Sequence, residues 1–202
     1  MTVLGAVPVK PFRSAKNRLA KEMTIPQRRL LAEHLGERTL AAVAEAGMEA
    51  MVLAADEEVA VWAKSLGYRA LLDPESDLNS AAKAAADLAA NEGRPWLLIH
   101  SDLPLIDAQA LGQALAALNE GRPVIAPSPD GGTPVMGWRG VELAFRYGPG
   151  SFGRHLCQLA AHQPLVATDF RLMFDIDRPA DLAFVLRRNR SLVERLSTLP
   201  AS

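Results

Sequence analysis

Strand-sized apolar runs alternate with helix-sized periodic stretches along most of this chain. Five runs have the length and composition of buried strands, and they are residues 3–9, 50–55, 68–73, 95–100 and 123–128. Between them, leucine and alanine recur at helical spacing at 26–47, 57–67, 79–93 and 107–121. This alternation predicts an α/β fold in which helices cover both faces of a mostly parallel sheet.

The last third of the chain departs from this rhythm. Residues 128–150 hold six glycines and three prolines, which predicts loops with one or two short antiparallel strands at the sheet edge. After them we expect a helix at 151–163, a strand at 172–177 and a closing helix at 179–189. A chain of 202 residues can bury one substantial core. We therefore expect residues 1–202 to form a single domain.

Composition narrows the class of protein. The net charge of −1 and the isoelectric point near 6.4 argue against a nucleic-acid or membrane-surface binder, which needs a broad positive field. Residues 3–9 begin the chain without the basic and long apolar regions of a signal peptide, and no apolar run approaches a membrane span. Cys157 is the only cysteine, which excludes an intrachain disulfide. A cytoplasmic protein is the natural expectation.

A basic loop follows the first predicted strand. Residues 7–20 read VPVKPFRSAKNRLA and carry Lys10, Arg13, Lys16 and Arg18, with no acidic residue before Glu22. In open α/β sheets, ligands bind outside the carboxyl ends of the strands. Unpaired cations at that place favour a bound phosphate chain over a solvated loop. Neither a Walker loop nor G-x-G-x-x-G is present, so the phosphate site is of another type.

Carboxylates occupy two further strand ends. Asp102 lies in HSDLPL after the fourth strand, and Asp175 and Asp177 lie in FDIDRPADL near the last. Such residues either cap the following turn or bind Mg²⁺ together with phosphate oxygens. Because they lie opposite the basic loop, they favour a metal–triphosphate site, with Asp175 or Asp177 as the second ligand.

A second anion site is predicted at GPGSFGRH, residues 148–155. Its glycines permit close approach, and Ser151 falls at the expected N-cap of a helix whose free N–H groups favour a phosphate. The alternative is a glycine-rich turn with an ordinary serine cap. GGT at 131–133 is a similar donor loop. No G-x-S-x-G motif or spaced histidine pair is present, which disfavours covalent hydrolase chemistry.

Taken in order, these stretches resemble the 2-phospho-L-lactate guanylyltransferase family of coenzyme F-420 biosynthesis. The matching segments are VPVKPFRSAKNRLA (7–20), LNSA (78–81), SDLPL (101–105), GGT (131–133), GPGSFGRH (148–155) and FDIDRPADL (174–182). They cover nearly the full chain in consistent order. The resemblance implies a nucleotidyltransferase architecture, Rossmann-like and similar to that of glycosyltransferase A. It also implies transfer of GMP from GTP to 2-phospholactate, phosphoenolpyruvate or 3-phosphoglycerate, with release of pyrophosphate.

The resemblance also implies roles for single residues and for Mg²⁺. Lys10, Lys16 and Arg18 would hold the GTP phosphates, and Lys10 could also contact the acceptor. Lys10, Arg18 and Asp102 would be catalytic, and Asp102 and Asp177 would bind Mg²⁺. Asn79 and Ser80 would lie near the base or ribose of the nucleotide, and Thr133, Gly148 and Ser151 would bind the acceptor. Relatives typically continue Gly-Gly-Thr with Asn, whereas this chain has Pro134, which lacks an N–H and an amide.

Several alternatives stay open at this stage. Pro134 motivates a nucleotidyltransferase for another phosphorylated acceptor, such as a sugar phosphate or a molybdenum-cofactor precursor. A non-catalytic nucleotide-binding protein is a third reading. Guanine could be read by Asp73, Glu75, Asp77 or backbone carbonyls. The expected partners are small molecules, not nucleic acid or membrane, and the chain could act alone or as a homodimer.

Overall fold

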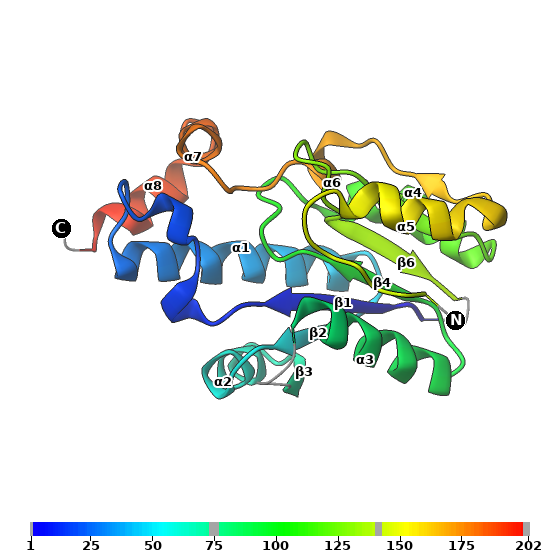
Figure 1. Cartoon of the computed structure of the whole chain (residues 1–202). Helices are drawn as coiled ribbons and strands as arrows, with labels where there is room; N and C mark the ends of the chain where they lie inside the picture. The colour runs from blue at the N-terminus through cyan, green and yellow to red at the C-terminus, as the bar shows by residue number, and fades with distance from the viewer. Residues whose placement is uncertain (1, 73–76, 140–142, 200–202) are drawn as a thin grey trace.

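The apolar runs of the sequence pair side by side in one sheet. The computed structural model describes residues 2–72, 77–139 and 143–199. Within them the strands are β1 (Leu4–Val9), β2 (Glu49–Ala54), β3 (Arg69–Leu72), β4 (Trp96–Ile99), β5 (Val124–Ala126), β6 (Val135–Trp138) and β7 (Leu165–Val166). Their order is β3-β2-β1-β4-β6-β5-β7 (Figure 1). All five strands predicted from the first 128 residues are confirmed.

Only β6 opposes the general strand direction in the described part of the chain. β1 pairs in parallel with β2 and β4, β2 with β3, and β5 with β7, while β6 is antiparallel to both β4 and β5. The antiparallel strand in 128–150 is therefore confirmed, but its predicted place at the sheet edge is wrong. β6 is an interior strand, and Val135 and Met136 are completely buried.

Side-chain caps begin several helices where the sequence pattern expects them. The helices are α1 (Ile25–Glu45), α2 (Glu57–Ser65), α3 (Leu78–Asn91), α4 (Ala108–Asn119), α5 (Ser151–Leu159), α6 (Phe170–Met173), α7 (Pro179–Leu186) and α8 (Arg190–Ser197). Thr24 and Gln27 form a capping box before α1. Asp56, Asp77 and Asp107 each accept an N–H at the start of their helix.

Helices cover both faces of the sheet, as predicted (Figure 1). On one face, α1, α2 and α4 pack through residues that include Leu40, Val59 and Leu111. On the other face, α3 packs against β1 and β4, and α5 packs against β5. The buried residues of α3 are Ala82, Ala85 and Ala89, whose small side chains allow this helix to approach the sheet closely. The inner strands β1, β2, β4 and β5 are thus covered on both faces, which explains why their sequences are continuously apolar.

The C-terminal part of the fold differs most from the sequence prediction. Residues 172–177 form the end of α6 and an extended stretch, not a strand, and β7 lies beside β5 instead. The apolar residues of this segment face helices: Leu172 belongs to the core under α4, whereas Ile176 packs with α1, α7 and α8. α7 and α8 lie against the N-terminal half of α1 (Figure 1), and α8 was not predicted.

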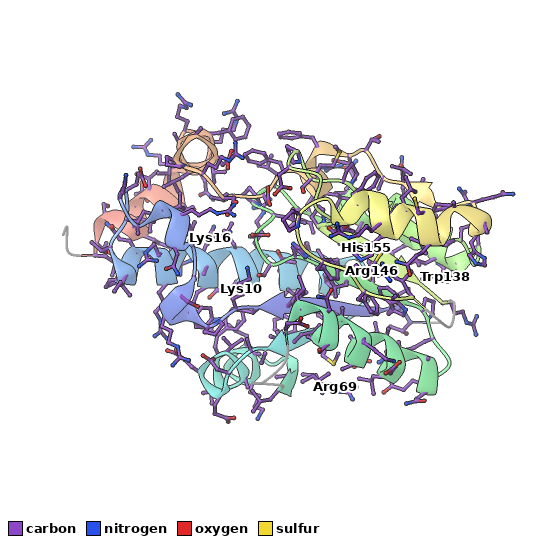
Figure 2. The ribbon with its side chains drawn as sticks, in the orientation of Figure 1. Lys10, Lys16, Arg69, Trp138, Arg146 and His155 are labelled. Carbon is purple, nitrogen blue, oxygen red and sulfur yellow. The ribbon has the colours of Figure 1, made fainter. Side chains whose placement is uncertain are left out.

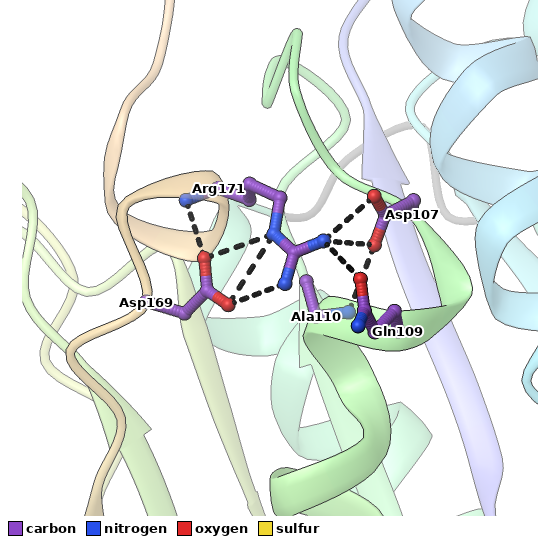
Figure 3. A network of polar contacts seen from close by, with 5 residues as sticks. All are labelled: Asp107, Gln109, Ala110, Asp169 and Arg171. Atoms are coloured by element: carbon purple, nitrogen blue, oxygen red, sulfur yellow. Dashed lines mark hydrogen bonds and ion pairs between the residues drawn. The ribbon is translucent and has the colours of Figure 1, made fainter.

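Arg171 connects the start of α4 to the C-terminal segment. Its guanidinium donates to both oxygens of Asp107 at 2.9 and 2.8 Å, to Gln109 at 3.1 Å and to Asp169 at 2.7 Å (Figure 3). Asp107 is also the N-cap of α4. A planar fork of donors suits two carboxylates at once. The loop that carries Asp102 and the stretch that carries Asp175 are therefore held at a fixed separation.

None of the helices in the described ranges combines the length and the apolar character that crossing a membrane requires.

Gly137 permits the close packing of β6 on β4. A Cβ at this position would lie 2.5 Å from the Trp96 carbonyl oxygen and 2.9 Å from Leu97 Cα. We expect Gly137→Ala to lower the free energy of unfolding by about 1–3 kcal/mol because backbone must move. Gly112, an exposed residue in α4 with open space around its Cβ, is the matched control. Gly112→Ala should raise stability by about 0.5–1 kcal/mol. Urea denaturation of both variants measures the difference, and equal effects would contradict this account.

Candidate functional site

A cavity of about 870 Å³ opens at the carboxyl ends of β1, β2 and β4. Most of the residues predicted from the sequence line it, namely Lys10, Lys16, Arg18, Asp102, Thr133, Gly148, Ser151 and Asp177. Asn79 and Ser80 do not line it. The topology explains this gathering, because the loops after neighbouring parallel strands meet at one edge of the sheet.

Arg28 holds the loop after β1 in place through hydrogen bonds. This arginine of α1 is only 7% exposed, and it donates to the Ala15 carbonyl at 3.0 Å and to the Asn17 side chain. Those two residues flank Lys16, which adopts a left-handed conformation with φ of 51°. The left-handed conformation is unfavourable for a residue that carries a Cβ, and the contacts on both sides of Lys16 hold its backbone there. They therefore also fix the direction of the Lys16 side chain. Sequence reasoning missed Arg28.

The Lys16 ammonium joins three distant segments. Its Nζ donates to Asp102 Oδ2 at 2.8 Å and to the Ile176 carbonyl at 2.6 Å, and its side chain is 10% exposed. The Ile176 N–H in turn donates to the Asp102 carbonyl at 3.2 Å. Burial opposes ionisation of Asp102, but the charges of Lys16, His100 and Lys10 together outweigh it and lower the pKa of this carboxyl. Asp102 therefore remains a carboxylate, and its Oδ1 is buried without a partner among the described residues.

Asp175 and Asp177 have different neighbours. Asp177 forms an ion pair with Arg18, whereas burial and the nearby charge of Asp102 raise the pKa of Asp175 to about 6. Neither lies on a strand, so the predicted placement at alternate strand positions is wrong, although both line the cavity. A cation bound between Asp102 and Asp175 would relieve this repulsion.

Lys10 is the exposed cation of the loop. It lies just beyond the end of β1, with Lys16 farther along the same segment (Figure 2). Lys10 forms no ion pair with another described residue, while it lines the cavity. Arg13 is exposed and is not part of the lining.

A turn at residues 128–132 adds groups that sequence reasoning missed. The Ser128 hydroxyl donates to Asp130 Oδ1, and the Gly132 N–H donates to the Ser128 hydroxyl at 2.9 Å and to Asp130 at 3.1 Å. The hydrogen bond from Ser128 lowers the pKa of Asp130. Both Ser128 and Asp130 line the cavity. Their signal in the sequence was the turn pattern SPDGG.

Thr133 and Ser151 meet in a buried network with His155. Thr133 Oγ1 lies 3.0 Å from Ser151 Oγ and 3.1 Å from His155 Nδ1. The N-cap of α5 is Gly150, with φ of 68°, and Ser151 is the first helical residue, so the predicted N-cap is wrong by one position. The Ser151 and Phe152 N–H groups donate to carbonyls of Gly148 and Gly131 at 3.0 and 3.1 Å. This leaves side-chain hydroxyls, rather than these two N–H groups, to face a ligand.

Asn79 and Ser80 lie behind the cavity wall at the start of α3. The Asn79 side-chain carbonyl accepts from the Tyr147 N–H at 2.6 Å, and the Ser80 N–H and hydroxyl donate to Asp77 at 2.9 and 3.2 Å. Asn79 thus positions Tyr147, which lines the cavity. Asp77 also lines it, whereas Asp73 and Glu75 lie outside the described residues. The roles assigned to Asn79 and Ser80 stay predictions.

One side of the cavity is apolar. The lining there consists of residues at the ends of β2 and β3 and on the first turns of α3: Leu53, Ala54, Ala55, Leu71, Leu78 and Ala81. The polar side is formed by loops beside β4, β5 and β6, where His100 also lines the wall and burial lowers its pKa. Apolar residues at strand ends are indistinguishable from core in a sequence, so this division was not predicted.

Curated relatives match almost the whole chain. A phosphoenolpyruvate guanylyltransferase of Sphaerobacter thermophilus is 38% identical over 192 residues, covering 90% of this chain and 91% of the relative. A 2-phospho-L-lactate guanylyltransferase of Methanothermobacter thermautotrophicus is 30% identical over 189 residues, covering 92% and 85%.

Solved structures share the fold. A nucleotidyl transferase from Methanothermobacter has a TM-score of 0.63 at 15% identity, covering 96% of this chain and 99% of that one. A Mycobacterium tuberculosis H37Rv protein solved as a manganese complex has a TM-score of 0.61 at 18% identity, covering 94% and 100%. The chain therefore has a nucleotidyltransferase-like fold.

The family described as guanylyl transferase CofC-like matches residues 1–190. Together with the relatives of 30% and 38% identity, this match shows that the chain belongs to the CofC-like guanylyl transferase family.

Proposed function

We propose that this protein transfers GMP from GTP to a phosphorylated three-carbon acid and releases pyrophosphate, as a step in coenzyme F-420 biosynthesis. The observation that carries the proposal is the cavity. Its lining brings Lys10, Lys16 and Arg18 together with three aspartates and two hydroxyls, namely Asp102, Asp175, Asp177, Thr133 and Ser151. The names of the relatives support GTP as donor and phosphoenolpyruvate or 2-phospho-L-lactate as acceptor.

The nucleotide fits the side of the cavity near β1 to β3. Its base would occupy the apolar wall, where Leu53, Leu71 and Leu78 can pack on the faces of a purine. Asp77 lies at the edge of that wall and can accept hydrogen bonds from guanine N1–H and N2–H₂. The triphosphate would then run toward Lys10, Lys16 and Arg18.

The acceptor fits the side near β6 and α5. Thr133 and Ser151 are hydroxyl donors there, and Gly148 admits close approach of the backbone. Pro134 lies at the same wall, and its carbonyl accepts from the His100 N–H at 2.8 Å. Because Pro134 offers no N–H or amide, the acceptor meets fewer fixed donors in this chain than in relatives with Asn.

The reaction needs orientation more than proton transfer. An oxygen of the acceptor phosphate forms a bond to the α-phosphorus of GTP, and the bond from that phosphorus to the bridging oxygen of pyrophosphate breaks. The acceptor phosphate is largely dianionic at pH 7, since its second pKa is about 6, so no general base is required. The chain contributes by holding two anions in line and by stabilising charge on the leaving group. Lys10, Lys16 and Arg18 are placed for that task.

The carboxylates fit Mg²⁺, which takes one or two carboxylates and shares phosphate oxygens. No group of three or more His, Cys, Asp or Glu side chains gathers as a metal cage among residues 2–72, 77–139 and 143–199, which suits an ion that arrives with the triphosphate. Asp102 and Asp177 would hold it, with Asp175 as the alternative second ligand. When bound, Mg²⁺ neutralises phosphate charge and assists the departure of pyrophosphate.

Removing the Asp102 charge should abolish turnover. We expect Asp102→Asn to lower the rate of pyrophosphate release from GTP and phosphoenolpyruvate by about 10²–10³-fold, because both the metal and Lys16 lose their shared carboxylate. Chelation of divalent ions with EDTA should stop the wild-type reaction, and added Mg²⁺ should restore it. The measurement is coupled pyrophosphate detection.

The control variant is Asp87→Asn on the exposed face of α3, where Asp87 pairs only with Lys83. It should keep wild-type activity. Full activity of Asp102→Asn would remove the proposed metal role. Tight GTP binding by the wild type without turnover on any acceptor would instead identify a non-catalytic nucleotide-binding protein.

Lys10 and Arg13 provide a matched pair in one loop. Lys10→Met should raise the KM for GTP by about 10-fold or more, because a charge-assisted contact to phosphate is lost. Arg13→Met removes the same charge from an exposed residue outside the cavity lining and should change KM by less than about twofold. Initial rates at varied GTP decide between them, and equal effects would mean that only the net charge of the loop matters.

The acceptor is decided by a panel of substrates. Pyrophosphate release should be measured with GTP, ATP, CTP and UTP, each crossed with phosphoenolpyruvate, 2-phospholactate, 3-phosphoglycerate and sugar phosphates. Turnover with a sugar phosphate alone would favour the second candidate function, a nucleotidyltransferase for another phosphorylated acceptor, which Pro134 motivates.

A further inference from the structure

His155 is the most deeply buried titratable side chain beside the acceptor wall. It is 0% exposed and packs edge-on against Tyr147, with ring centroids 4.9 Å apart. It does not itself line the cavity, and the proposed chemistry does not use it. Both of its ring nitrogens nevertheless have close polar partners, which distinguishes it from a histidine that only fills space.

The partners of His155 determine where its proton lies. Nε2 lies 2.9 Å from the Arg146 backbone N–H, which can only donate, so Nε2 must accept and carry no proton. Burial, assisted by the charge of Arg154, lowers the pKa of His155 to about 4, and the ring is neutral near pH 7. Its single proton is therefore on Nδ1, from which it donates to Thr133 Oγ1 at 3.1 Å.

This tautomer fixes the direction of the hydrogen bonds that follow. Thr133 and Ser151 have two hydroxyl protons between them, and one proton fills the 3.0 Å contact between their oxygens. The other proton has no acceptor among the described residues. Thr133 and Ser151 are each 1% exposed and both line the cavity. The network thus presents one spare donor to the cavity, whichever hydroxyl carries it.

We propose that His155 is a positioning residue that orders the Thr133 and Ser151 hydroxyls so that their one spare proton is donated to an oxyanion of the acceptor. This inference rests on the proposed function for the identity of the acceptor. A donor inside a buried, low-dielectric wall recognises a carboxylate or phosphate oxygen more strongly than a solvated hydroxyl does. The oxyanion can belong to either group of the phospho-acid, and the experiment distinguishes them.

The test is a double-mutant cycle on acceptor binding. His155→Phe keeps an aromatic ring against Tyr147 but removes both nitrogens, and Thr133→Val keeps the branched shape but removes the hydroxyl. Each should raise the KM for phosphoenolpyruvate about 5- to 30-fold, with the KM for GTP changed less than about twofold. Because His155 acts through Thr133, the double variant should be no worse than Thr133→Val alone. Thr133→Ser retains the hydroxyl and should restore most of the affinity that Thr133→Val loses.

The proposal would be overturned in favour of a purely structural role by either of two results. One is a KM for phosphoenolpyruvate that rises in the double variant by the product of the two single effects. The other is a KM for GTP that rises as much as the KM for phosphoenolpyruvate. Should His155→Phe not fold, ¹⁵N-histidine NMR of the wild type tests the same point. Protonation of His155 at Nδ1 supports the proposal, and protonation at Nε2 contradicts it.

Direct binding separates this inference from the proposed function. Calorimetry of 2-phospholactate, and of its analogue with an alcohol in place of the carboxylate, should be compared between wild type and Thr133→Val. Weakening for 2-phospholactate alone assigns the carboxylate, and weakening for both assigns the phosphate. Unchanged binding of both refutes the inference even if turnover is observed. Absence of turnover on all phospho-acids refutes the proposed function, while the calorimetry still tests whether the hydroxyl network binds the phospho-acid.

Discussion

The ion pair between Lys16 and Asp102 is the constraint on which the site depends. A buried ion pair repays the cost of desolvation only when both partners are well placed. Here Lys16 Nζ has two oxygen partners, Asp102 and the Ile176 carbonyl, from segments 86 and 160 residues away. Arg28 fixes the backbone of Lys16, and Arg171 fixes the spacing of the other two segments. The surrounding structure therefore serves to hold one ammonium against one carboxylate.

The reversed direction of β6 brings the acceptor side to this pair. β1 and β4 deliver their following loops to the carboxyl edge of the sheet, as parallel strands do. An antiparallel strand delivers its beginning to that same edge, so Thr133 and Pro134, which precede β6, lie at the end of β4. Gly137 makes the insertion of β6 sterically possible. A parallel strand in this place would have moved the hydroxyl wall to the opposite edge.

The sequence contained most of the fold and about half of the site. Strands buried on both faces are continuously apolar, which is why β1, β2, β4 and β5 were predictable. The segment 172–177 has a similar pattern, but Leu172 and Ile176 are buried against helices, and a hydrophobic pattern does not state what covers a residue. The charges at Lys10, Lys16 and Asp102 were recognisable because they follow strands. Arg28 and His155 were not, because each acts through contacts between residues distant in sequence.

Under the proposed function, the two halves of the cavity recognise anions by different physical means. The cations of residues 10–18 attract any anion, and their long-range field alone does not distinguish a triphosphate from a phospho-acid. Hydroxyls of Thr133 and Ser151 are neutral, and their hydrogen bonds depend on distance and angle. If both sides were cationic, either substrate could occupy either place. Neutral, directed donors on one side make that exchange unfavourable, because a triphosphate there would lose its cations without gaining enough donors. Cations on one side and directed neutral donors on the other would thus assign each of the two anions its own place in the cavity.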